Sequence, residues 1–223
     1  MSFFERLERE TSAERLALYS VPQLVDGVAG RISRETYLGY LAEAYHHVSQ
    51  TVPLLTAARD RMDVAHASFR AALDEYIAEE TGHEAWVLND IASAGGDAEA
   101  VRTGAPRPAT ELMVSYAHDY VARVNPMGMF GMVYVLEGTS IALATHGAGA
   151  VSRALGLGAE CFSYLSSHGS LDQEHMKFFA GLMDTVEDPE DQAAILHVAR
   201  RIFALFADMF RSIPHQTRLA HAV

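Results

Sequence analysis

The stretch that decides the fold class is 189-PEDQAAILHVARRIFALFADMF-210. Its apolar side chains recur every three or four residues, at Ile195, Val198, Ile202, Leu205, Phe206 and Met209. This spacing is that of one face of an α-helix, whereas the alternation typical of strands is short wherever it occurs in the chain. We therefore predict a helix over about 189–212. It should begin at Asp188-Pro189, because proline suits a first helical turn.

The same period extends back through the chain and predicts six further helices. They cover about 3–18, 34–62, 68–94, 109–123, 127–155 and 160–185. Ser33 is the expected N-cap of the second helix, which Pro53 should bend or break. Gly128 and Gly131 should permit close helix packing. The sequence thus predicts an all-α protein, with residues 1–223 folded as one seven-helix bundle.

Composition narrows the class of protein. Hydrophobic residues make up 49% of the 223 residues, which is enough for one sizeable core, and the formal net charge is −12. This charge disfavours nucleic acid or an anionic membrane as the main partner. The single cysteine, Cys161, forms no intramolecular disulfide, no apolar run approaches 18 residues and the N-terminus lacks an apolar signal core. We expect a cytoplasmic homodimer that acts on a small molecule.

The strongest chemical motif is His168-x3-Asp172-x2-His175. At about 100° per residue, its three side chains share one face if the segment is a single helix. A break at Gly169 would turn His168 away. Two imidazoles and a carboxylate suit iron or manganese. The alternative is a solvated helix face.

A second motif is Glu79-Glu80-Thr81-Gly82-His83. Glu80 and His83 form Glu-x-x-His, the i, i+3 pair of carboxylate-bridged di-metal bundles. On one continuous helix Glu79 could also face His83, and the shorter rise along the axis favours Glu80. The alternative is that both glutamates cover the surface.

The third signal is Glu137 within the apolar segment 132–139. A buried carboxylate is costly unless it is paired or bound to metal. Glu137 and Tyr134 are candidate catalytic residues; a satisfied buried acid and a core tyrosine are the alternatives. The six candidate metal ligands on three helices are Glu80, His83, Glu137, His168, Asp172 and His175.

Four more residues are candidates either for an additional ligand or for residues that support the ligands without binding the metal. They are Glu43, His46, His47 and Tyr76. Glu43 precedes His47 by four residues, so that helix could add a ligand. The alternative places the two histidines in the core. Tyr76, like Tyr116, Tyr120 and Tyr164, is also explained as amphipathic core.

At these residues the sequence resembles the heme-oxygenase-like di-iron oxidases and oxygenases, relatives of thiaminase II and pyrroloquinoline-quinone synthase. The resemblance covers about 35–180. It rests on Tyr45-His46-His47, Glu80-Thr81-Gly82-His83, Glu137 and His168-x3-Asp172-x2-His175. It implies a heme-oxygenase-like bundle, two iron ions per chain and O2 as co-substrate.

The resemblance also assigns roles to residues. The positions that correspond to ligands of the family are His83, Glu137, His168, Asp172 and His175. Some relatives place another ligand seven residues before the equivalent of His83, where this chain has Tyr76, so the second iron should bind weakly. Thiaminases use a cysteine nucleophile, but Cys161 lies away from the ligand positions. Thiamine hydrolysis is therefore not expected.

The leading hypothesis is an iron-dependent oxidase or oxygenase that activates O2 to oxidise a small organic molecule. One alternative is a cofactor-free oxidase of the quinone-synthase type, in which histidines and tyrosines bind substrate and move protons. Another is a non-catalytic metal-binding protein on the same fold. A heme oxygenase would need one proximal histidine, which His46 or His47 could supply, but it would leave the other motifs unexplained.

Overall fold

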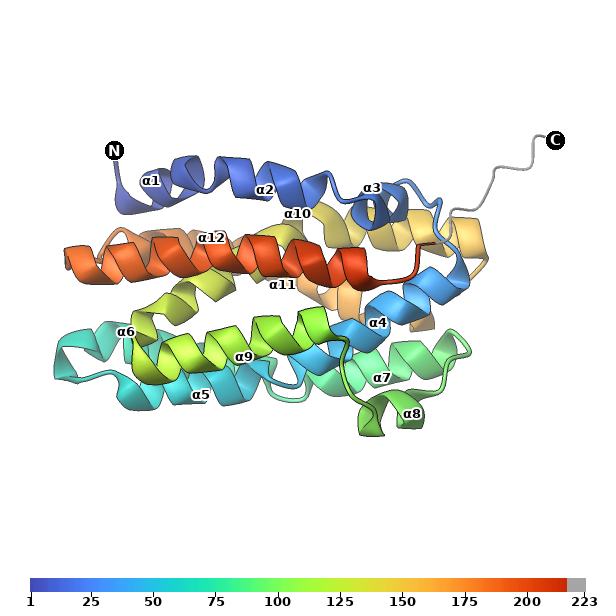
Figure 1. Ribbon diagram of the computed structural model, residues 1–223, viewed down its shortest axis with the longest axis horizontal. Coiled ribbons are helices and arrows are strands. Elements are labelled where there is room, and N and C mark those ends of the chain that lie inside the picture. Colours follow the sequence, from blue (N-terminus) through green and yellow to red (C-terminus); the bar gives the residue numbers. More distant parts are fainter. Residues whose placement is uncertain (216–223) are drawn as a thin grey trace.

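The computed structural model describes residues 1–215, apart from the side chains of residues 144, 145 and 168–175. Its regular structure is helical, and the described part of the chain contains no strand. The α-helices (Figure 1) are α1 Phe3–Glu10, α2 Ser12–Tyr19, α3 Pro22–Val28, α4 Arg34–Val48, α5 Thr51–Arg61, α6 Ala67–Glu80, α7 His83–Ser93, α8 Ala98–Thr103, α9 Pro108–Arg123, α10 Met129–Leu155, α11 Ser163–Met183 and α12 Pro189–Ser212. Short 3-10 turns lie at η1 Val64–His66, η2 Pro126–Gly128 and η3 Ala159–Cys161.

The predicted all-α class is confirmed, but the described residues form more helices than the seven expected. Three of the predicted helices are each divided in two, giving α1–α2, α4–α5 and α6–α7, and the short α3 and α8 lie in stretches where no helix was predicted. The α4–α5 break falls before Pro53, which therefore sits in the first turn of α5, where its missing N–H needs no partner. The α6–α7 break contains Gly82 at φ +94°, a left-handed conformation that favours glycine.

Two predicted helix starts are confirmed. The Ser33 hydroxyl accepts a hydrogen bond from Thr36 N (3.2 Å) and caps α4. The Asp188 carboxylate accepts one from Glu190 N (2.8 Å) and caps α12, with Pro189 in the first turn. Each cap satisfies an N–H that has no partner within its helix.

The long helices α10 and α12 cross closely at the centre of the bundle (Figure 1). A Cβ on Gly131 would lie only 2.8 Å from Ala199 N, and one on Gly128 would lie 2.8 Å from Val198 Cγ2. The predicted role of these two glycines in close packing is confirmed.

One described stretch, Pro126–Leu143, has the length and hydropathy of a membrane span, which the sequence analysis did not expect. Of this stretch, 56% is buried inside the protein, as in a core helix.

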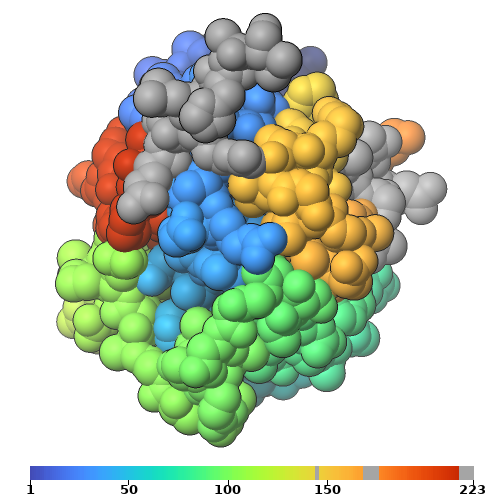
Figure 2. All heavy atoms as spheres, turned by 90° about the vertical axis from the view of Figure 1, so that its right-hand side faces the viewer, coloured from blue at the N-terminus to red at the C-terminus, as the bar shows by residue number. Residues whose placement is uncertain are grey.

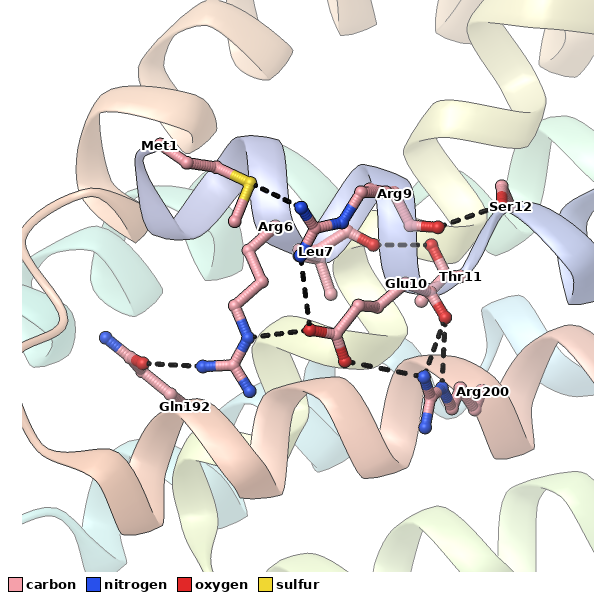
Figure 3. A network of polar contacts seen from close by, with 9 residues as sticks. All are labelled: Met1, Arg6, Leu7, Arg9, Glu10, Thr11, Ser12, Gln192 and Arg200. Carbon is pink, nitrogen blue, oxygen red and sulfur yellow. Dashed lines mark hydrogen bonds and ion pairs between the residues drawn. The ribbon is translucent and has the colours of Figure 1, made fainter.

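A polar network fastens the N-terminal helix to α12 (Figure 3). Arg200 donates to the backbone carbonyl of Glu10 at 2.9 and 3.1 Å, and Arg6 Nε lies 2.9 Å from Glu10 Oε1. Arg6 also reaches Gln192 Oε1 at 3.2 Å. The apolar side of α1, with Phe3 and Leu7 buried, is thereby held on the bundle.

Candidate metal centre

A cavity of about 180 Å³ runs between α3, α4, α10 and α12 and reaches the end of α6 and the start of α11. Its wall is mostly aliphatic and aromatic. Among the described lining residues, the two with charged side chains are Glu80 and Glu137. The segments of α4, α10 and α12, each of which contributes to the wall, come together at one end of the molecule (Figure 2). The cavity thus brings together two carboxylates that are far apart in the sequence.

Glu80 and His83 meet across the break between α6 and α7. Glu80 Oε2 lies 3.1 Å from His83 Nδ1, and the His83 side chain is buried. The imidazole also stacks on Trp86, with ring centroids 4.1 Å apart and planes at 23°. The expectation that one helix carries both residues is wrong, because Gly82 turns the chain between them. The angular comparison of Glu79 with Glu80 therefore does not apply, and the structure separates them directly: Glu80 lines the cavity, whereas Glu79 is exposed.

The third predicted ligand group lies outside the described residues. α11 extends from Ser163 to Met183, but nothing is described of the side chains of His168, Asp172 and His175. Among the residues whose side chains are described, no three histidine, cysteine, aspartate or glutamate side chains gather as a metal site would require. Glu80, His83 and Glu137 are therefore the part of the predicted ligand set that the structure locates.

Two of the four additional candidates line the cavity. His47 is buried on α4, with its ring 5.7 Å from that of Phe206 at an edge-on angle of 85°. Tyr76 is buried on α6, one helical turn before Glu80. Both are near enough to the cavity to contact whatever occupies it.

The other two additional candidates point elsewhere. Glu43 is buried, but its Oε2 accepts hydrogen bonds from Arg107 N (3.1 Å) and Thr110 Oγ1 (2.5 Å). It thus joins α4 to the start of α9 and does not line the cavity. His46 does not line it either, and burial lowers the pKa of its imidazole.

Tyr134 lies in the core and does not line the cavity. Its hydroxyl accepts a hydrogen bond from Arg15 Nη1 (2.8 Å), and its ring stacks with that of Phe179 at 6.1 Å and 19°. Burial raises the pKa of its hydroxyl. The position matches the alternative of a core tyrosine, so Tyr134 has no part in the function proposed below.

Sequence reasoning missed Asp90, a carboxylate with no exposed surface on α7. Its oxygens accept hydrogen bonds from Ser163 N (2.9 Å), Ser163 Oγ (2.5 Å) and Tyr164 N (2.9 Å) at the start of α11. Burial raises the pKa of its carboxyl group. The signal that could have found it was an aspartate between the apolar Val87 and Ile91, since buried acids need partners.

Cys161 is buried in η3 and is not among the residues that line the cavity. Burial raises the pKa of its thiol, which disfavours the thiolate that a nucleophile requires. Its carbonyl accepts a hydrogen bond from the Tyr37 hydroxyl at 2.6 Å. Both observations agree with a structural cysteine.

The donor atoms at the cavity fit iron. Carboxylate oxygens and imidazole nitrogens suit this metal, and a cation is a suitable partner for two carboxylates in one mostly apolar wall. Glu80 and Glu137 on the cavity wall, and His83 beside Glu80, supply such donors. The same donors would also accept manganese, so the choice of metal needs a further observation.

Comparison with known proteins provides it. The model of a family described as "Iron-containing redox enzyme" matches residues 38–207. The chain is similar to a domain of unknown function with a heme oxygenase-like fold from Shewanella denitrificans OS217, with 21% identity, coverage of 96% of this chain and 92% of that one, and a TM-score of 0.85. It is also similar to a TenA homologue from Pseudomonas syringae (12% identity, 93% and 90% coverage, TM-score 0.79) and to heme oxygenase from Leptospira interrogans (16%, 94% and 98%, 0.76). At these identities the structural likeness concerns the fold, and it confirms the expected heme-oxygenase-like architecture. No curated protein matches the sequence.

Proposed function

Because the chain belongs to the family of iron-containing redox enzymes, we propose that it oxidises a small organic molecule with O2 at two iron ions held between α6, α7, α10 and α11. The observation that carries the proposal is that Glu80 and Glu137 line the same, mostly apolar, cavity. A cation between them would offset the cost of keeping two carboxylates in that wall. The residues proposed to hold the iron ions are Glu80, His83, Glu137, His168, Asp172 and His175.

Bound iron would supply the electrons that the reduction of O2 requires. The side chains around it fix positions. The Glu80 carboxylate lies against Nδ1 of His83 and thereby orients the imidazole, so that Nδ1 is the ring nitrogen that faces the carboxylate. Stacking on Trp86 fixes the plane of the ring. A site with so little freedom can bind metal without a large ordering cost.

The cavity wall supports a substrate that is small and largely apolar. Side chains such as Leu136, Val133 and Phe206 line the cavity and offer contact to hydrocarbon. His47 and Tyr76 bring polar atoms to the same space, where they can orient a substrate or hold a proton at the imidazole or the phenol oxygen. We also propose that the protein is a cytoplasmic homodimer and that neither nucleic acid nor membrane is its partner. The net charge of −12 supports the absence of both partners.

The test is anaerobic loading with ferrous iron, metal analysis, and then exposure to O2. We expect up to two irons per chain, the second bound more weakly, and consumption of O2 with a transient absorption in the visible. Iron content that stays near zero would contradict the proposal. Iron that binds without any O2 consumption, with or without small apolar molecules, would favour a non-catalytic metal-binding protein.

A second candidate is a cofactor-free oxidase that binds an organic substrate through histidine and tyrosine. The position of His47, Tyr76 and Tyr164 on the cavity wall favours it. Turnover that is equal in metal-free and iron-loaded protein would identify this alternative. Turnover that rises with iron content would exclude it.

A further inference from the structure

Asp90 caps a helix to which it does not belong. Phe162, the residue before α11, makes no side-chain hydrogen bond to the first turn of that helix. The acceptors come instead from α7: Asp90 receives the N–H groups of Ser163 and Tyr164 and the hydroxyl of Ser163. The first N–H groups of a helix have no partner within it, so this carboxylate satisfies donors that the helix itself cannot.

The contact fixes α11 more firmly than packing alone. Asp90 has no exposed surface, and its two oxygens hold two successive residues, so the first turn can neither slide nor rotate without breaking a partly buried hydrogen bond. The Tyr37 hydroxyl, which donates to the carbonyl of Cys161 at 2.6 Å, holds the segment just before α11 from the side of α4.

Asp90 and the residues it binds lie one or two helical turns from the proposed ligands on α7 and α11. It follows His83 by seven residues on α7, which is two turns and about 20° round the helix. On α11, Tyr164 precedes His168 by four residues, about one turn. A slip of α11 by one residue would move its side chains by about 1.5 Å and turn them by about 100°. Metal–ligand distances tolerate only about 0.2 Å.

We propose that Asp90 is a positioning residue that sets the place of α11 relative to α7, and thereby the distance between His83 and the ligands on α11. The inference rests on the proposed iron site. The proposed role of Asp90 differs from a purely stabilising one, because the position of the start of α11 would then affect the affinity for iron.

The test compares Asp90→Asn with Asp191→Asn. Asp191 is also a buried carboxylate, bonded to Asn125 Nδ2 (2.8 Å) and His66 Nε2 (2.9 Å), but it does not line the cavity, and these two hydrogen bonds lead to neither α7 nor α11. Each substitution replaces one acceptor by a donor in a partly buried network. We expect both to lower the Tm of the metal-free protein. Only Asp90→Asn should weaken ferrous binding, by about tenfold or more. Losses of this size are typical when a residue that orients metal ligands, without binding the metal itself, is replaced.

A metal-free measurement completes the test. In Asp90→Asn the amides of Ser163 and Tyr164 should exchange hydrogen faster than in wild type, while those at the start of α12 keep their protection. Ser163→Ala, which removes one of the three hydrogen bonds, should give a smaller effect in the same direction and serves if Asp90→Asn does not fold. Unchanged iron affinity in Asp90→Asn, or an equal loss in Asp191→Asn, would overturn the inference and leave the proposed function standing. Wild-type protein that binds no iron would overturn both, whereas the exchange rates would still show whether Asp90 holds α11.

Discussion

Glu43, Asp90 and Asp191 are buried carboxylates whose oxygens accept hydrogen bonds from neighbouring helices or turns. Their partners are identified, and their role is to join elements. Glu80 and Glu137 differ because both line the cavity. The position of an acid relative to the cavity, more than its burial, therefore distinguishes a structural residue from a candidate ligand.

The paired variants Glu80→Ala and Glu79→Ala test which of two adjacent glutamates binds iron. Glu80 lines the cavity and contacts His83, whereas Glu79 is exposed. We expect Glu80→Ala to lose about one iron per chain after anaerobic loading, since one carboxylate leaves the ligand set. Glu79→Ala, the matched control, should keep both. The opposite pattern would assign the ligand to Glu79.

Cys161→Ser should leave iron content and turnover nearly unchanged. The thiol is buried, its pKa is raised by burial, and the residue does not line the cavity. Serine is close in size, so any loss should appear in the Tm rather than in kcat. A variant that folds and binds iron but has lost turnover would restore the cysteine-nucleophile hypothesis.

At the scale of helices, close packing of α10 on α12 and the break between α6 and α7 place the site. Gly131 lets α10 approach the backbone of α12, and Glu137 lies on α10 six residues later. Gly82 lets α6 end where α7 begins, so that Glu80 and His83 meet. Both glycines act through the backbone and contribute no side chain to the site.

Gly131→Ala should destabilise the protein by about 1–3 kcal/mol, because the new Cβ meets backbone atoms of α12 that cannot move aside. Gly181→Ala on α11 is the control. A Cβ there meets nothing within 4 Å, and alanine should stabilise the helix by about 0.5–1 kcal/mol. Denaturant unfolding measures both. Equal effects of the same sign would show that the crossing of α10 and α12 is looser than described.

The contact of η1 with α12 should depend on pH. Burial lowers the pKa of His66, and the hydrogen bonds and charges of Asp191 and Asp63 raise it by more, so the net shift is upward. Protonated His66 therefore stabilises the fold fully below its unfolded pKa of about 6.5, and this stabilisation is lost as pH rises through the higher folded pKa. The Tm difference between wild type and His66→Gln should be larger at pH 6 than at pH 9. A difference that grows with pH would reverse the assigned shift.

At the scale of the molecule, hydrogen bonds join α3 and α4 to the C-terminal end of α12, and all three helices line the cavity. Gln23 Nε2 donates to the carbonyls of Arg211 (3.3 Å) and Ile213 (3.1 Å), and Thr36 Oγ1 donates to that of Pro214 (3.0 Å). Since ligands from four helices would meet at one site, iron binding should oppose unfolding of the whole bundle. Size-exclusion chromatography with light scattering will test the proposed homodimer.

Anaerobic loading with ferrous iron should raise the Tm. A ligand that binds only the folded state stabilises it by about 2.7 kcal/mol when its concentration is 100 times Kd. Calcium at the same concentration provides the control, because it prefers more oxygen ligands and no imidazole. A Tm that rises equally with both cations would indicate general screening of the −12 charge and not a specific site.

The sequence by itself determined the all-α class, the position of α12 from Asp188-Pro189 onward, the Ser33 cap and the closely packing glycines, because periodicity, capping and backbone sterics act within one or two turns. It also singled out Glu80, His83 and Glu137. Tertiary structure alone decided that Glu80 and Glu137 line one cavity, that Glu43 and Tyr134 have other partners, and that Asp90 caps α11. These are contacts between residues dozens of positions apart. The free energy of such contacts depends on which helix faces meet in space, which local patterns do not encode.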